Sequence, residues 1–90
     1  MQTLEPMLTG AEIPFSIDMA AKIPAGGSIS SAIVNVISGA SSVAVDRVTV
    51  SGTDVVFWVE ALAAGWAVFD VFATFSDTSE DGERVQVRVI

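Results

Sequence analysis

Apolar and polar residues alternate along most of the chain, whereas the spacing expected for an amphipathic helix is nearly absent. This alternation predicts half-buried β-strands over 12–19, 30–37, 43–50, 55–60, 66–76 and 84–90. Pro14 cannot donate to a β-ladder, so the first of these strands is expected at a sheet edge. The apolar register changes across Asp46 and Arg47, which predicts a β-bulge or a change of strand at that point.

Turn-forming residues separate these segments. They lie at 24–28, 38–42 and 51–54, and the acidic run 77–83 predicts the last loop, with Gly82 at positive φ. Only 61–65 suggests a short helical turn. About seven strands, with turn signals about every 8–12 residues, predict an all-β, immunoglobulin-like antiparallel β-sandwich. Pro6 and Gly10 indicate an N-terminal extended arm over 1–11, followed by a single sandwich domain over 12–90.

Length and charge narrow the classes of function. The 90 residues suit one domain, and 51% hydrophobic against 17% charged residues excludes a disordered chain. The formal net charge of −7 would repel phosphates, so neither a nucleic acid nor an anionic membrane surface is expected as partner. Segment 23–45 carries no charge, but its Gly and Ser content favours strand, turn and strand over a membrane helix. Neutral or basic protein surfaces remain the expected partners.

The side chains that most often carry catalysis are missing. The sequence contains no His, Cys or Tyr, which rules out a His-based triad, a thiol nucleophile and an imidazole metal ligand. Carboxylates remain, but no pattern places two of them in a cleft. We therefore expect a protein that is not an enzyme and needs no cofactor. The lack of Cys also excludes disulfides and fits assembly in a reducing cytosol.

The acidic run near the C-terminus resembles the start of an EF-hand loop. Asp77, Ser79, Asp81 and Gly82 follow the spacing of that calcium-binding motif. The twelfth position should be a bidentate Glu but is Arg88, and strands are expected on both sides. A solvated hairpin loop is the favoured interpretation and a calcium site with oxygen ligands is the alternative, so no metal site is assigned.

A second apolar surface is predicted on the strands that carry the two tryptophans. Alternation directs the tryptophans and three neighbouring apolar side chains away from the core-facing positions of their strands, which suggests a protein-binding patch. Its members are Val56, Trp58, Trp66, Val68 and Phe72. A register displaced by one residue, or coverage by the arm and loops, is the alternative.

Four stretches follow a pattern found in one group of proteins. They are 27–32 (Gly-Ser-Ile-Ser-Ser-Ala), 55–69, the Ser- and Thr-containing turn 76–82, and the closing 87–90 (Val-Arg-Val-Ile). Over residues 12–90 the chain resembles the small immunoglobulin-like virion proteins of tailed bacteriophages, which include fibre–tail adaptors and head-decoration proteins. Two positions depart from the pattern, because Ala61-Leu62 replaces a Gly-Gly pair and Phe69 replaces a Tyr.

The resemblance implies a non-enzymatic structural protein of the virion. The expected role is an adaptor that links tail or neck components to fibres, assembled in the bacterial cytoplasm. Its expected partners are other virion proteins, namely tail tube, adaptor ring, fibre or major capsid protein, together with further copies of itself in a homo-oligomer. A capsid decoration (cement) protein is one alternative. A carbohydrate- or surface-binding module that uses Trp58 and Trp66 as a stacking platform is another.

Overall fold

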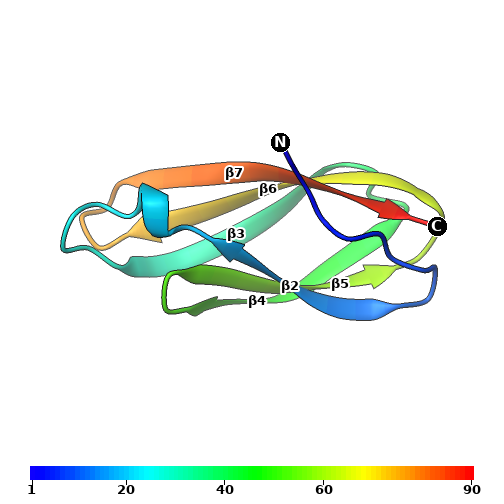
Figure 1. Cartoon of the computed structure of the whole chain (residues 1–90), viewed down its shortest axis with the longest axis horizontal. Coiled ribbons are helices and arrows are strands. Elements are labelled where there is room, and N and C mark those ends of the chain that lie inside the picture. Colours follow the sequence, from blue (N-terminus) through cyan, green and yellow to red (C-terminus); the bar gives the residue numbers. More distant parts are fainter.

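The computed structural model describes all 90 residues and is built almost entirely from β-strands (Figure 1). A single 3-10 turn, η1 (Ala20–Lys22), interrupts the strands. The strands are β1 (Gln2–Thr3), β2 (Glu12–Asp18), β3 (Ile29–Ser38), β4 (Val43–Ser51), β5 (Asp54–Ala61), β6 (Gly65–Phe75) and β7 (Glu80–Val89).

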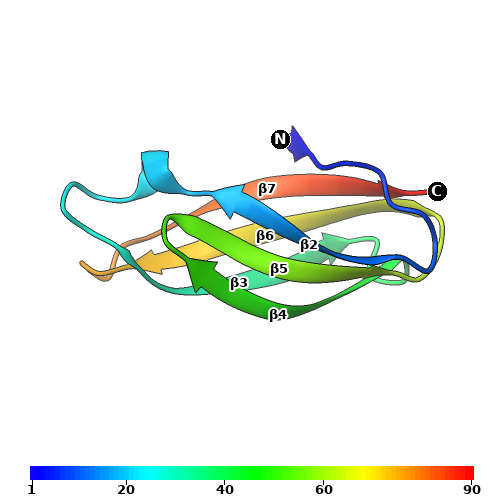
Figure 2. The same ribbon diagram turned by 60° about the horizontal axis from the view of Figure 1, so that its bottom comes forward.

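Two sheets pack face to face, which confirms the predicted all-β sandwich (Figure 2). One sheet has the order β1-β7-β6-β3 and the other has the order β2-β5-β4. If β2 to β7 are equated with immunoglobulin strands B to G, these orders become G-F-C and B-E-D, as in that fold. Every pairing is antiparallel except that of the short β1, which lies parallel to β7.

The core lies between the sheets and follows from the alternation in the sequence. On β5, β6 and β7 every second residue is apolar and faces inward, and the next points outward. Phe57 of β5 meets Phe69 of β6 edge to face, with ring centroids 5.9 Å apart. These two fully buried rings hold the sheets together near the centre of the sandwich.

Three local predictions agree with the structure. The strand with Pro14 is the edge strand β2, which pairs only with β5. The register of β4 against β5 shifts between Asp46 and Thr49, and Arg47 adopts a φ of 50°, so the register change is a bulge. Gly52, with a φ of 61°, occupies the first central position of the two-residue hairpin between β4 and β5.

The N-terminal segment is extended as predicted, but it is part of the sandwich rather than a separate arm over residues 1–11. It runs beside β7 (Figure 2), where the amide of Leu4 donates to the carbonyl of Gln86 over 2.8 Å. The amide of Met7 donates to the carbonyl of Arg88 over 2.9 Å. Leu4 and Met7 are both buried in the core, so this segment covers apolar side chains of the sandwich.

Three predictions about turns are wrong. The last loop does not extend over 77–83, because β7 already begins at Glu80 and pairs there with Thr74. The residue at positive φ in this hairpin is Thr78 (72°) and not Gly82. The helical turn lies at 20–22 and not at 61–65; it begins where the carboxylate of Asp18 accepts a hydrogen bond from the amide of Ala20.

Candidate functional site

The five residues predicted to form one apolar patch lie on two different sheets. Val56 and Trp58 belong to β5, in the three-stranded sheet, whereas Trp66, Val68 and Phe72 belong to β6, in the four-stranded sheet. All five point away from the core. Because the sheets pack with their inner faces together, the two groups face opposite sides of the molecule, and the prediction of a single patch is wrong.

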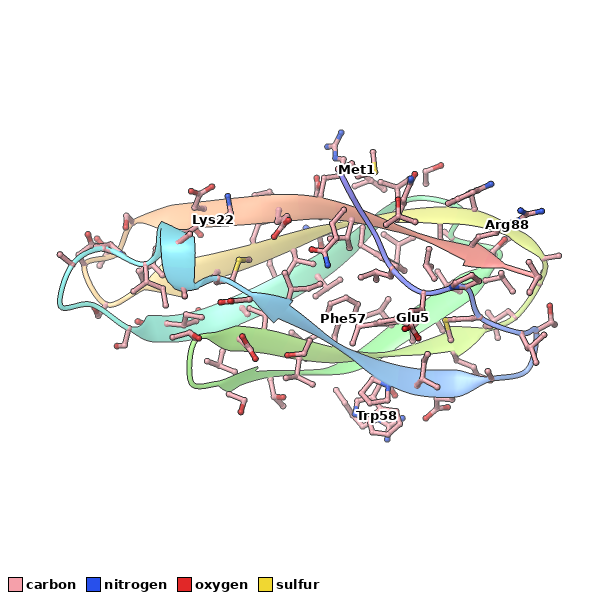
Figure 3. The ribbon with its side chains drawn as sticks, in the orientation of Figure 1. Met1, Glu5, Lys22, Phe57, Trp58 and Arg88 are labelled. Atoms are coloured by element: carbon pink, nitrogen blue, oxygen red, sulfur yellow. The ribbon has the colours of Figure 1, made fainter.

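The short connection between β5 and β6 explains this separation. Residues 62–64 carry the chain from one sheet to the other, so strands that are consecutive in the sequence are not neighbours in a sheet. Figure 3 shows the consequence: Phe57 points between the sheets, while the next residue, Trp58, projects outward from the three-stranded sheet. The two tryptophans therefore cannot form the shared stacking platform that a carbohydrate-binding module would use.

Trp58 is largely covered by its own chain. The guanidinium carbon of Arg47 lies 4.1 Å from the centroid of the indole, a cation–π contact, and Pro14 stands opposite Trp58 on β2. Arg47 also forms ion pairs with Glu12 and, over 3.3 Å, with Asp46. The bulge thus aims a basic side chain over the ring, so Trp58 and the half-buried Val56 offer little free apolar surface.

The outer face of the four-stranded sheet is different, because its large apolar side chains are open to solvent. Trp66 is 50% exposed and Phe72 is 38% exposed. Ile33 of β3, directly opposite Phe72, is 58% exposed, and Ile37 further along β3 is 45% exposed. Four of the nine exposed large hydrophobic residues of the chain therefore share this face. With the half-buried Val68 between them, they form what we call the outer apolar face: Ile33, Ile37, Trp66, Val68 and Phe72.

Ile33 and Ile37 were not among the residues predicted for the patch. Their signal is visible in the sequence, since 32–37 is apolar on both alternating sets of positions except at Asn35. Such a run is typical of a strand that is covered on both faces. In this structure β3 is covered on one face only, by the other sheet, which leaves the second set of apolar side chains in water.

A close contact with β7 fixes the ring of Phe72. Gly82 stands opposite Phe72 in the register of β6 and β7. A Cβ atom at Gly82 would lie 2.6 Å from Cδ1 of Phe72, so only glycine lets the ring lie against the β7 backbone. The aromatic side chain thereby covers a strand position that has no side chain of its own.

An ion pair crosses the outer face beside the apolar side chains. Arg84 donates two hydrogen bonds to the carboxylate of Asp70, from Nε over 2.8 Å and from Nη2 over 3.0 Å. These hydrogen bonds, together with the positive charge, lower the pKa of Asp70 below its ordinary value. Asp70 comes from β6 between Val68 and Phe72, so one compensated charge pair interrupts the apolar surface.

Three acidic residues of the last hairpin, Asp77, Glu80 and Asp81, are engaged locally. The carboxylate of Asp77 accepts hydrogen bonds from the amide and the hydroxyl of Ser79, and these bonds lower its pKa. Glu80 accepts a hydrogen bond from Thr74, and Asp81 lies 4.0 Å from the ammonium group of Lys22. No three carboxylates come together as metal ligands. The carboxylate of Asp77 thus stabilises the turn in which it lies.

No protein-family model and no curated protein matches this sequence. The structure contains no helix that is both long enough and apolar enough to cross a membrane.

Proposed function

We propose that this chain is a non-enzymatic structural protein of a tailed-phage virion, which links tail or neck components to fibres through protein contacts. The outer apolar face is its docking surface. The resemblance of residues 12–90 to immunoglobulin-like virion proteins supports the virion role, and the exposure of this face supports the mode of binding.

The outer apolar face is the observation that carries the proposal. Apolar side chains that gather on one exposed surface usually mark a site where another protein binds. Trp66 is half exposed on this face, and tryptophan is enriched among the residues that dominate binding energies. Burying these side chains against a partner would remove from water four of the nine exposed large hydrophobic residues of the chain.

The charge of the chain sets the chemistry of the partner. The formal net charge is −7, so a neutral or basic protein surface would approach without repulsion. On the outer apolar face itself the only ion pair is that of Asp70 with Arg84, and it is already compensated. A partner therefore needs apolar groups at the centre of the contact, and it should present no basic group to Arg88, which stands opposite Trp66 on β7.

Two tryptophans on opposite faces provide a matched pair of variants. Trp66→Ala should lower incorporation of the chain into virions by about tenfold or more, because a central tryptophan contributes strongly to binding. Trp58→Ala removes the same side chain from the face that Arg47 covers and should leave incorporation close to that of the wild type. Circular dichroism verifies that both variants fold. Equal incorporation of the two variants would refute the assignment of the docking face.

The copy number of the chain tests its place in the particle. Quantitative mass spectrometry of purified virions measures this chain relative to the major capsid protein. The adaptor role predicts a small fraction of the capsid subunit number, as expected at the neck or tail. A ratio close to one per capsid subunit would identify a decoration protein instead, and absence from the particle would refute the virion role.

A further inference from the structure

The two sheets have four lateral edges, and three of them are protected against pairing with another strand. On β2, Pro14 removes a backbone donor, and Glu12 and Asp18 flank it with charges. On β4, the bulge at Asp46 and Arg47 interrupts the edge. The edge of β7 is covered by the N-terminal segment, which pairs with it from residue 2 onward. Unpaired strand edges readily template further strands, and these features prevent it.

The fourth edge, β3, has no such protection along its centre. It pairs only with β6, and it contains neither a proline nor a charged residue. The whole segment 23–45 is uncharged. The regular part of β3, residues 31–36, therefore presents unpaired backbone N–H and C=O groups with nothing on the strand to repel a second strand.

Incomplete burial beside this edge, which β3 shares with the edge strands β2 and β4, leaves apolar surface that a further strand could cover. The inward-facing residues of β3 are Ala32, Val34 and Val36, and all three are only partly buried. Their partners on β6, Ala73, Val71 and Phe69, are completely buried. The apolar interior is thus sealed at β6 but remains open to water along β3. A further strand on this edge would cover it.

The sequence of β3 is symmetric about Asn35. Residues 33–37 read Ile-Val-Asn-Val-Ile, the same in both directions. In an antiparallel pair of identical strands related by a two-fold axis, each residue before the central one faces the equivalent residue after it. A two-fold axis at Asn35 therefore pairs Ile33 with Ile37 of the second copy, Val34 with Val36, and Asn35 with itself. Within 33–37 every cross-strand pair is then chemically matched, although Ile37 lies at the irregularity between Val36 and Ser38, so the fully regular two-fold pairing covers 34–36.

We propose that β3 binds the β3 strand of a second copy of this chain, antiparallel and centred on Asn35. The contact joins two four-stranded sheets into one continuous sheet. A two-fold contact of this kind closes on itself and gives a dimer rather than a fibre. The uncharged edge suits a second copy in particular, because two chains of charge −7 can approach here without opposing like charges directly.

The dimer has a consequence for the outer apolar face. Ile33 and Ile37 belong both to the β3 edge and to that face, so the faces of two copies become one surface across the junction. The β3 contact itself does not depend on the virion role. Register shifts between Ile29 and Ser31 and between Val36 and Ser38 limit the length of regular pairing, so we expect a dissociation constant in the micromolar to millimolar range.

Charge substitutions at Asn35 test the two-fold contact on the full chain by sedimentation equilibrium over a concentration series. Asn35→Lys places two lysines opposite each other in the dimer and should raise the dissociation constant roughly fivefold to tenfold. Within one chain Asn35 faces Asp70, so the lysine gains an opposite charge and the fold is kept. An equal mixture of N35K and N35D should restore the dimer, because lysine then faces aspartate; within the N35D chain the new carboxylate stands opposite Asp70, whose charge Arg84 compensates, and circular dichroism verifies that this variant folds. Thr49→Lys on the edge strand β4 is the matched control and should leave dimerisation unchanged.

Single cysteines test the register. The chain has no Cys, so Asn35→Cys introduces one thiol, which faces its own copy and should form an intermolecular disulfide under mild oxidation. Ile33→Cys faces Ile37 of the second copy and should not link to itself, whereas a mixture of I33C and I37C should link. A wild-type chain that stays monomeric up to millimolar concentration would overturn the proposal. So would equal weakening by T49K and N35K, or disulfide formation by I33C alone as fast as by N35C.

Discussion

The N-terminal segment provides a sharp test of the packing, because its side chains differ greatly in burial. Met7 is 2% exposed and belongs to the core, whereas the next residue, Leu8, is 67% exposed. We therefore predict that Met7→Ala strongly destabilises the fold and that Leu8→Ala does not. The backbone hydrogen bonds from Met7 to Arg88 over 2.9 Å and from Ile90 to Met7 over 2.8 Å are available to alanine as well. The difference between the variants thus measures side-chain burial.

The magnitude follows from the apolar volume that is lost. Truncating a buried methionine to alanine costs about 2–5 kcal/mol, from lost transfer free energy and from the cavity that remains. Met7 lies at the rim of the core, where neighbouring residues can relax, so about 2–3 kcal/mol is expected. Each 1 kcal/mol moves the thermal midpoint of a domain of this size by about 4–8 °C, so M7A should unfold roughly 10–20 °C lower. Leu8→Ala should stay within about 0.5 kcal/mol of the wild type.

Urea denaturation followed by circular dichroism measures both variants. The expected result is a lower denaturation midpoint for M7A at an unchanged slope, and a wild-type midpoint for L8A. If M7A retained the wild-type midpoint, the N-terminal segment would not be packed on the core. If both variants lost stability equally, the burial of Met7 would not be the cause.

Further predictions concern an ion pair and two glycines. Stability should fall in the acidic range, because Arg84 lowers the pKa of Asp70 in the folded state. The ion pair stabilises the fold fully at pH values above the ordinary carboxyl pKa of 3.8. This stabilisation is lost as the pH falls through the lower pKa of the folded state. Arg84→Gln should return the pKa of Asp70 toward 3.8 in a carbon-13 NMR titration, and an unchanged pKa would exclude Arg84 as the cause. Gly39→Ala should cost about 3 kcal/mol or more, because φ is 76° and the Cβ atom would lie 2.2 Å from the carbonyl oxygen of Trp66. Gly52→Ala, at a φ of 61° in open space, should cost only about 1 kcal/mol, and equal losses in chemical denaturation would contradict this account.

The sequence predicted the strands and their buried faces well, because alternation is a local property. The odd positions of β5, Val55, Phe57 and Val59, are apolar in the sequence and fully buried in the structure. The bulge after Asp46 was equally visible, since an extra residue on one strand shifts the apolar positions from one alternating set to the other. A few neighbouring residues therefore determine both which segments form strands and which of their side chains point inward.

The composition of the site could not be predicted, because it depends on which strands share a sheet. Alternation correctly placed Trp58 and Trp66 on outward positions, but it does not tell whether β5 and β6 are neighbours. The connection at 62–64 crosses between sheets, which separates the tryptophans and brings Phe72 beside Ile33 instead. Likewise, the burial of Met7 depends on an opening beside β7 that only the assembled sandwich creates.

Hydroxyl-radical footprinting of the two tryptophans, in the free chain and in purified virions, tests the proposed docking face most directly. Trp66 lies on the outer apolar face and Trp58 lies on the opposite sheet beneath Arg47, so each serves as the control for the other in one sample. We predict that assembly protects Trp66 from oxidation and leaves Trp58 as reactive as in the free chain. Protection of Trp58 with Trp66 still fully reactive would contradict the assignment of the outer apolar face as the binding surface.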